Sequence, residues 1–259
     1  MDGPLHGIRV LDLTRVLAGP VATRFLAGYG ADVLRIDPPD WDEPGVIPEV
    51  TLGKRSARLD LRERAARERF EILLSEADIL VHGYRPGALD RLGYGPAARR
   101  ALSPGLIDVS LNAYGWSGPW ATRRGFDSLV QMSAGIAEAG MQWRQADKPV
   151  PLPVQALDHA TGYVMAATAI RAVTRRLDDR IGTEARLSLA RTAKLLTDGG
   201  AAGPSSPHAA ETPAMLSSAV EQTDWGDAQR LAPPAAVTGV AMQWAHPARK
   251  LGSAAPVWS

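Results

Sequence analysis

The sequence predicts an α/β fold: a Rossmann-like parallel sheet with flanking helices. Short apolar runs rich in β-branched residues alternate with segments whose apolar residues recur at helical spacing. Strands separated by helices usually pair in parallel, because each helix carries the chain back across the sheet. The composition agrees with this class, since 45% of the 259 residues are hydrophobic and can supply a core.

The elements follow one another in regular order. The run at 8–14, IRVLDLT, predicts a strand, and the segment 19–30 has helical spacing and closes on glycine. A strand-like run at 31–39 stops at two prolines, which lack the backbone donor that a strand needs. The alternation then continues with a helix at 62–76 and strands at 78–84 and 105–115. Sheets of this kind bind ligands at the carboxyl ends of their strands.

The second half of the chain has a different pattern. An Ala-rich segment at 160–177 predicts a long helix, and 185–200 fits a strand or a helix. The stretch 199–214 is rich in Gly, Pro, Ala and Ser, which is typical of a linker. We therefore expect a large domain over 1–198, a linker over 199–214, and a loop-rich C-terminal segment over 215–259 that wraps the large domain.

Charge and composition narrow the function classes. The chain has 29 Lys and Arg against 28 Asp and Glu, so no strong field favours nucleic acid or a membrane surface as a partner. The absence of cysteine excludes disulfides, thiolate catalysis and Cys-ligated zinc. No secretory leader and no apolar stretch of about 18 residues is evident. We expect a cytoplasmic protein.

Familiar nucleotide, metal and hydrolase motifs are missing. The glycines do not form a G-x-G-x-x-G or phosphate-loop pattern, and no G-x-S-x-G is present. The five histidines show no metal-binding spacing, so we expect no metal site. The basic cluster GKRSARLDLRER at 53–64 has two interpretations, a phosphate contact or, more simply, a solvated charged face.

One acidic residue stands out at the start of the Ala-rich helix. Asp158 could be the N-cap of that helix, accepting hydrogen bonds from its first free amides. It could instead be a carboxylate nucleophile that attacks an activated acyl group, where the helix amino end stabilises negative charge. Spacing alone favours the cap and does not decide between the two.

Four ordered blocks carry a resemblance that bears on this choice. GIRVLDLTRVLAGPVATRFLAGYGADVLRIDPP, GKRSARLDLR, ADILVHGYRPGALDRLGYG and PVQALDHATGYVMAATAIRAV together resemble family III CoA-transferases, the group of formyl-CoA transferase and carnitine CoA-transferase. The resemblance runs from residue 6 to about 198. It implies the large domain of that fold, with Asp158 as a nucleophile that forms an aspartyl-CoA thioester. It also implies no permanently bound cofactor, since coenzyme A enters as acyl-CoA substrate.

The resemblance also implies a set of binding residues. Coenzyme A would contact five positions, with the two arginines near its phosphates: Ala18, Leu59, Tyr84, Arg91 and Arg124. Asp127 lies where members often carry an active-site acid. The amides of His159 and Ala160 would stabilise an oxyanion, and the donor and acceptor would be an acyl-CoA and a carboxylic acid. Considered alone, Arg91 could be a surface ion-pair partner, Tyr84 a half-buried aromatic and Asp127 a structural residue.

Several positions depart from the family pattern. Gly83 and Pro38 replace an Asn and a basic residue that often contact the nucleotide. Phe126 replaces the histidine of related racemases, which disfavours an acyl-CoA racemase or epimerase. The small domain of longer members has no counterpart here, and 215–259 resembles their returning segment. The alternative to an active CoA-transferase is therefore a non-catalytic or partner-dependent CoA-binding protein. We also expect the chain to form a homodimer or to associate with a partner subunit.

Overall fold

A six-stranded parallel sheet forms the centre of the molecule, which confirms the predicted α/β class. The computed structural model describes residues 3–200, 210–233 and 235–259. The strand order is β3-β2-β1-β4-β5-β6, and all neighbouring strands pair in parallel. The chain thus winds outward from β1 to β3 and then returns to β4, so the β1/β4 boundary is the switch point of a doubly wound sheet. The strands are β1 (Arg9–Leu13), β2 (Asp32–Asp37), β3 (Arg55–Arg58), β4 (Ile79–His82), β5 (Ile107–Asn112) and β6 (Thr183–Ser188).

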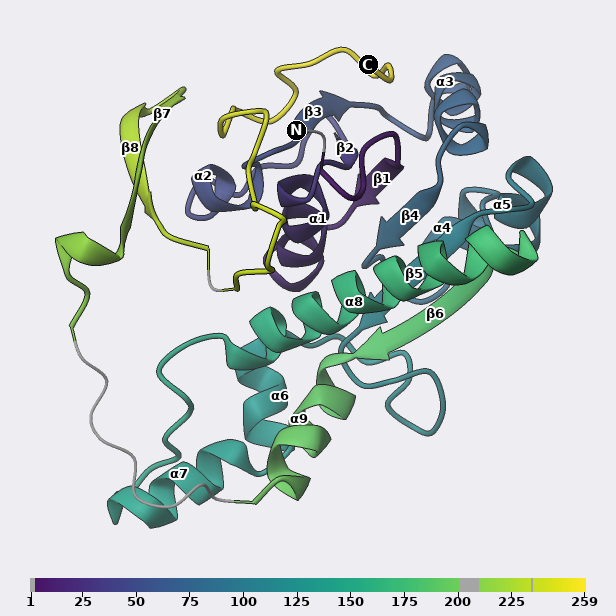
Figure 1. Cartoon of the computed structure of the whole chain (residues 1–259). Coiled ribbons are helices and arrows are strands. Elements are labelled where there is room, and N and C mark those ends of the chain that lie inside the picture. The colour runs from purple at the N-terminus through teal and green to yellow at the C-terminus, as the bar shows by residue number, and fades with distance from the viewer. Residues whose placement is uncertain (1–2, 201–209, 234) are drawn as a thin grey trace.

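Helices cover both faces of this sheet (Figure 1). Side chains alternate between faces along a strand, and here neither face is left to water. On one face Val10 and Val33 pack against α1 (Ala18–Gly28) and α8 (Ala156–Asp179). On the other face Leu11 and Leu34 pack against α3 (Arg64–Ser75), close to α5 (Pro96–Leu102). The sheet therefore has two buried apolar clusters, one on each side.

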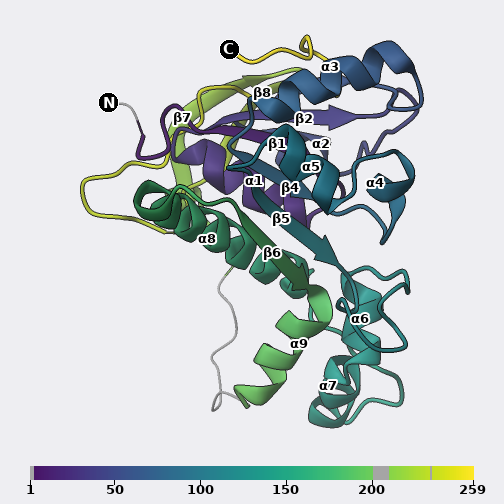
Figure 2. The same ribbon diagram turned by 90° about the vertical axis from the view of Figure 1, so that its right-hand side faces the viewer.

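Several smaller elements lie outside the sheet and its main helices. Some belong to the connections at the carboxyl edge of the sheet, and others belong to the C-terminal part of the chain. Figure 2 shows α6, α7 and α9 as a projecting group beyond the ends of β5 and β6. A separate antiparallel hairpin, β7–β8, was not predicted from the sequence. These elements are α2 (Ile47–Val50), α4 (Ala88–Arg91), α6 (Asp127–Ser133), α7 (Ile136–Arg144), α9 (Leu189–Asp198), η1 (Pro213–Met215), β7 (Leu216–Thr223) and β8 (Gly226–Leu231).

One interpretation made from local pattern is wrong, and one choice that the pattern left open is resolved. The first half of the basic cluster 53–64 is not a solvated face: Lys54 is 2% exposed, and 55–58 forms β3 with Ala57 fully buried. Only the later arginines, such as Arg62, are exposed. The segment 185–200, for which a strand or a helix was open, forms the end of β6 and then α9. A strand rich in arginine was missed because its charges have partners far away in the sequence.

The C-terminal segment lies along β3 and α3. The Ala254 amide donates to the Ser56 carbonyl at 2.8 Å, and the Trp258 indole donates to the Leu73 carbonyl at 3.2 Å. Nearer the hairpin, the Gln243 amide donates to the Gly28 carbonyl at 2.8 Å. Residues 201–209, within the expected linker, lie outside the described part of the chain. Within the described part, no helix is long and apolar enough to cross a membrane.

Candidate active site

The carboxyl edge of the sheet gathers most of the residues singled out from the sequence. All six strands are parallel, so their carboxyl ends lie at one edge. The helices α1 and α8 run back across the sheet, and both therefore begin at this edge. Ala18 is the first residue of α1, and Asp158 is the third residue of α8. The fold thus places the two helix amino ends, and these two residues, on the same side of the molecule.

The two helix amino ends are in close contact. A Cβ added to Gly162 of α8 would lie 2.5 Å from the Ala18 carbonyl oxygen, so only glycine permits this approach. Ala18 and Leu157 also belong to one buried apolar cluster. Asp158 follows Leu157 directly and lies about one turn before Gly162. The structure therefore brings Asp158 beside the β1–α1 turn.

Asp158 is a buried carboxylate without a hydrogen-bond donor. The residue is 7% exposed. Among the described residues its side-chain oxygens accept no hydrogen bond, yet they are not fully enclosed. Burial, together with the nearby Asp127 charge, raises the pKa of Asp158 to about 7. A carboxylate in this state is poorly solvated in its charged form and remains reachable from outside.

The N-cap interpretation of Asp158 is wrong. The helix begins earlier than predicted, with Gln155 at the cap position and Asp158 in the first turn. The Asp158 amide is instead bound by another side chain: it donates to Oδ2 of Asp127 at 2.9 Å. Asp127, which is 2% exposed, therefore satisfies one of the free amides of α8. The suggested amide donors also fail, because the His159 amide donates to the Gln155 carbonyl at 3.1 Å and Ala160 lies still deeper in the helix.

Asp127 is itself held by Gln131, a residue that sequence analysis missed. The Gln131 side-chain amide donates to Oδ1 of Asp127 one helical turn away. Its carbonyl oxygen accepts from the Leu152 amide at 2.8 Å, which ties the segment before α8 to α6. Gln131 is 2% exposed. The position of the α8 amino end is therefore set by α6 through two side chains.

The binding residues inferred from resemblance fall into two groups. Leu59 and Tyr84 follow the ends of β3 and β4 and pack against the same apolar cluster. Arg91 and Arg124 are exposed, and each follows a strand end at the same edge. Neither arginine forms an ion pair within the described residues, so Arg91 does not have the surface ion-pair role considered for it. The structure does not bring these two arginines into contact with Asp158.

Arg15 is a further cation at this edge that sequence analysis missed. It lies two residues after the end of β1, at the switch point of the sheet. Its guanidinium is 4.4 Å from the ring centre of Trp41 and 5.2 Å from that of Tyr84. It also donates to the Tyr84 hydroxyl at 3.3 Å. Two aromatic rings and the buried carboxylate of Asp37, whose Oδ1 lies 3.8 Å from Nε of Arg15, thus hold a charge where doubly wound sheets bind anionic ligands.

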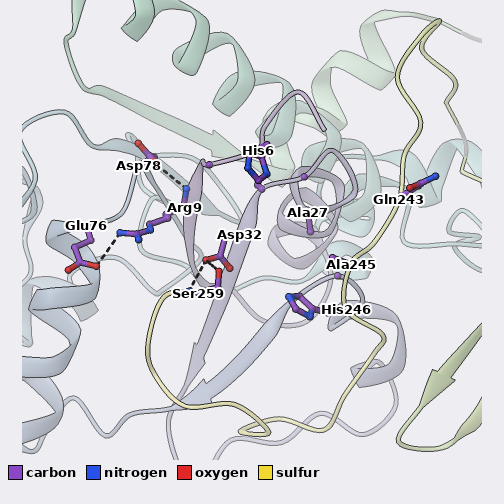
Figure 3. Close-up of a pocket in the computed structure, with 14 residues that line it drawn as sticks. His6, Arg9, Ala27, Asp32, Glu76, Asp78, Gln243, Ala245, His246 and Ser259 are labelled. Carbon is purple, nitrogen blue, oxygen red and sulfur yellow. Dashed lines mark hydrogen bonds and ion pairs between the residues drawn. The ribbon is translucent and has the colours of Figure 1, made fainter. Parts of the chain in front are cut away.

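A cavity lies in another part of the fold. It has a volume of about 550 Å³ and lies at the amino edge of the sheet, between His6 and the C-terminal segment (Figure 3). Its charged side chains are already paired: Glu76 with Arg9, and Asp32 with both Arg55 and the Ser259 hydroxyl. None of the candidate active-site residues named above lines it. This cavity therefore does not mark the candidate site. Within the described residues, no group of three or more His, Cys, Asp or Glu is placed to hold a metal ion.

Comparisons with known proteins agree on one family. CoA-transferase family III matches residues 5–232. A probable fatty acyl-CoA transferase of Mycobacterium tuberculosis is 35% identical over 187 residues, covering 67% of this chain and 47% of that protein. A formyl-CoA:oxalate CoA-transferase of Escherichia coli is 30% identical over 203 residues, covering 73% of this chain and 48% of that protein.

Solved structures agree with this result. The crystal structure of a hypothetical protein from Mycobacterium tuberculosis superposes with a TM-score of 0.70 at 32% identity, covering 76% of this chain and 57% of that one. A CAIB/BAIF family protein from Brucella suis gives a TM-score of 0.68 at 25% identity, covering 88% of this chain and 65% of that one. The chain spans about half the length, or less, of the curated relatives that it matches.

Proposed function

The chain belongs to CoA-transferase family III, and on this premise we propose that it moves CoA from an acyl-CoA donor to a carboxylic acid acceptor, with Asp158 as the nucleophile. Coenzyme A chemistry is common to the relatives by name, which include acyl-CoA and formyl-CoA:oxalate CoA-transferases. The observation that carries the proposal is the state of Asp158: a buried carboxylate without a donor, held at a helix amino end.

The reaction follows from carboxylate chemistry. The Asp158 carboxylate attacks the thioester carbonyl, the C–S bond breaks, and a mixed anhydride and CoA thiolate result. The thiolate then attacks the Asp158 carbonyl, which releases the donor acid and leaves an aspartyl-CoA thioester. The acceptor carboxylate attacks the carbonyl of this thioester, which breaks the C–S bond and gives a second mixed anhydride and CoA thiolate. The thiolate finally attacks the acceptor carbonyl of this anhydride, which forms the new acyl-CoA and frees the Asp158 carboxylate. An acyl bond is exchanged at each step, so the thioester's energy is retained.

The surroundings of Asp158 support this role physically. A carboxylate that is not stabilised by hydrogen bonds is a better nucleophile than a solvated one, and its pKa near 7 leaves a large ionised fraction at neutral pH. The α8 amino end favours negative charge nearby. Asp127 accepts a hydrogen bond from the Asp158 amide and so fixes the position of the nucleophile. In our proposal Asp127 orients Asp158 and does not react.

Coenzyme A would lie across the switch point of the sheet. We assign contacts to Ala18, Leu59 and Tyr84, and phosphate contacts to the exposed cations Arg91 and Arg124. Their position after strand ends at the carboxyl edge supports this assignment. Arg15, held between two aromatic rings, extends the set.

Four further parts of the proposal concern the whole protein. We assign 1–198 to the large domain, 199–214 to a linker and 215–259 to a segment that returns to the large domain, a return supported by the hydrogen bonds of the described C-terminal segment to the sheet and to α3. We also propose association, as a homodimer or with a partner subunit, for which exposed apolar side chains such as Trp143 are candidate contacts. We place the protein in the cytoplasm.

Phe126 carries no ionisable group, which argues against a two-base racemase.

A transfer assay tests the function. Purified protein is incubated with an acyl-CoA and a panel of carboxylic acids, and newly formed acyl-CoA is separated by chromatography. We expect wild type and Asp147→Asn, an exposed-carboxylate control, to form product, and Asp158→Asn to form none. Tight CoA binding by all three proteins without any transfer would favour the non-catalytic alternative.

A further inference from the structure

The turn between β1 and α1 is bound by buried ionic groups. Oδ1 of Asp12 accepts from the Thr14 amide at 2.8 Å and from its hydroxyl at 2.5 Å. Oδ2 of Asp12 accepts from Nζ of Lys54 at 2.9 Å, and Lys54 also donates to the Pro20 carbonyl at 3.0 Å. Asp12 and Lys54 are both essentially buried. Both ends of the turn, at Thr14 and Pro20, are thus anchored to one ion pair.

The middle of this turn holds an unusual backbone conformation. Val16 has a φ of 65°, in the left-handed region that favours glycine. A β-branched residue is strained there, because its Cβ crowds the following carbonyl. Such a conformation persists only where neighbouring contacts enforce it. The ionic groups at Thr14 and Pro20 bind the two ends of the turn, so a contact on Val16 itself would add a constraint at its middle.

Glu43 provides that contact from the loop after β2. Its Oε2 accepts from the Val16 amide at 2.9 Å. Its Oε1 accepts from the Arg35 guanidinium at 2.5 Å, and Arg35 is bound in turn to Asp37. The Glu43 side chain is only 9% exposed, and Arg35 is fully buried. A charge-assisted bond from a carboxylate fixed in this way can hold the strained amide in place.

The strained turn leads directly into the candidate site. Ala18 follows Val16 by two residues, and its carbonyl lies against Gly162 of α8. On the other side of the turn, Arg15 lies between the rings of Trp41 and Tyr84. A shift at Val16 would therefore move Ala18 and Arg15 together. Asp158 has a separate anchor, because Asp127 of α6 accepts the hydrogen bond of its amide.

We propose that Glu43 is a positioning residue for the CoA site: it holds Val16 in the left-handed conformation and so fixes Arg15 and Ala18 where acyl-CoA binds. This inference rests on the proposed function. The reacting group does not depend on Glu43, so the inference separates substrate binding, which Glu43 supports, from acyl transfer, which Asp158 performs.

The test compares four proteins by calorimetric CoA binding, steady-state transfer kinetics and thermal melting. They are wild type, Glu43→Ala, the double variant Glu43→Ala with Val16→Gly, and Asp40→Ala as an exposed control in the same loop. We expect Glu43→Ala to raise Kd for CoA and KM for acyl-CoA about tenfold, with kcat within about twofold of wild type. The double variant should recover most of this loss, because glycine adopts the left-handed conformation without strain. Asp40→Ala should match wild type.

The outcomes are distinguishable. If wild type binds CoA and Glu43→Ala binds it equally well, the inference is overturned and the proposed function stands. A lower melting temperature with unchanged Kd, or a loss of binding that Val16→Gly does not recover, also overturns it. If wild type binds no CoA, the proposed function fails and the inference fails with it. Should Glu43→Ala not fold, Glu43→Asp keeps the charge beside Arg35 but withdraws from Val16, and the same rise in Kd and the same recovery by Val16→Gly are expected.

Discussion

Replacing Asp158 by asparagine should stabilise the folded protein at alkaline pH. The carboxylate is buried without a donor, and its pKa rises from an ordinary 3.8 to about 7. Each pKa unit corresponds to about 1.4 kcal/mol, so the ionised carboxylate costs about 4 kcal/mol of unfolding free energy at pH 8 as an upper figure. A neutral amide of the same shape avoids that cost.

The sign of the pH dependence follows from the raised pKa. Below about pH 4 Asp158 is protonated in both the folded and the unfolded state, and the charge costs nothing. As the pH rises, the unfolded state ionises first, so the wild type loses stability until the folded carboxylate has also ionised, above about pH 7. The gain from Asp158→Asn should therefore be about 2 kcal/mol at pH 5 and about 4 kcal/mol at pH 8.

Urea unfolding of wild type, Asp158→Asn and the exposed control Asp147→Asn at both pH values measures these differences. We expect the gain for Asp158→Asn to grow from pH 5 to pH 8 and Asp147→Asn to follow wild type. A gain below about 0.5 kcal/mol at pH 8 is within the range of ordinary surface substitutions and would refute the claim that the site disfavours the charged carboxylate.

Three further outcomes follow. CoA transfer should fall about tenfold per pH unit below pH 7, because only ionised Asp158 attacks; a flat kcat/KM profile from pH 5.5 to 9 would contradict this. Asp127→Asn removes the neighbouring charge that helps to raise the pKa of Asp158, which should move the midpoint of that profile below 7; an unmoved midpoint would show that this charge does not tune the site. Gly162→Ala would place a methyl group 2.5 Å from a carbonyl of α1 and should cost about 1–3 kcal/mol in urea unfolding, whereas Gly83→Ala, with open space around it, should cost far less. Equal stabilities of the two glycine variants would argue against the close helix contact.

The parts of the fold that depend on local signals could be predicted from the sequence. The first strand, helix and strand were placed within two residues of β1, α1 and β2, because turn residues and prolines mark their ends. The strand β3 was missed, since a lysine and two arginines in five residues suggest a solvated face. Lys54 is buried because its ammonium group is paired with the Asp12 carboxylate, and Asp12 lies 42 residues earlier in the chain. Local composition cannot contain such a partner.

The candidate site also combines residues that local sequence signals identify with contacts that they do not. The sequence marked Asp158 and Asp127 individually but did not show that one holds the amide of the other across 31 residues. The start of α8 was placed four residues too late for a related reason: Asp127, a side chain from another helix, binds an amide of its first turn. Arg15 and Glu43 carry no motif. Their significance comes from the aromatic rings and the strained amide that the fold places beside them.

The most direct test of the account is a covalent one. Wild type, Asp158→Asn and Asp147→Asn are incubated with a panel of acyl-CoA thioesters, treated with hydroxylamine, and measured by intact mass and peptide mapping. Hydroxylamine converts an aspartyl thioester or anhydride to a hydroxamate. We predict a hydroxamate at Asp158 in wild type and in Asp147→Asn, and none in Asp158→Asn. An unmodified Asp158 in folded wild-type protein that binds CoA and turns over its substrate would contradict the account.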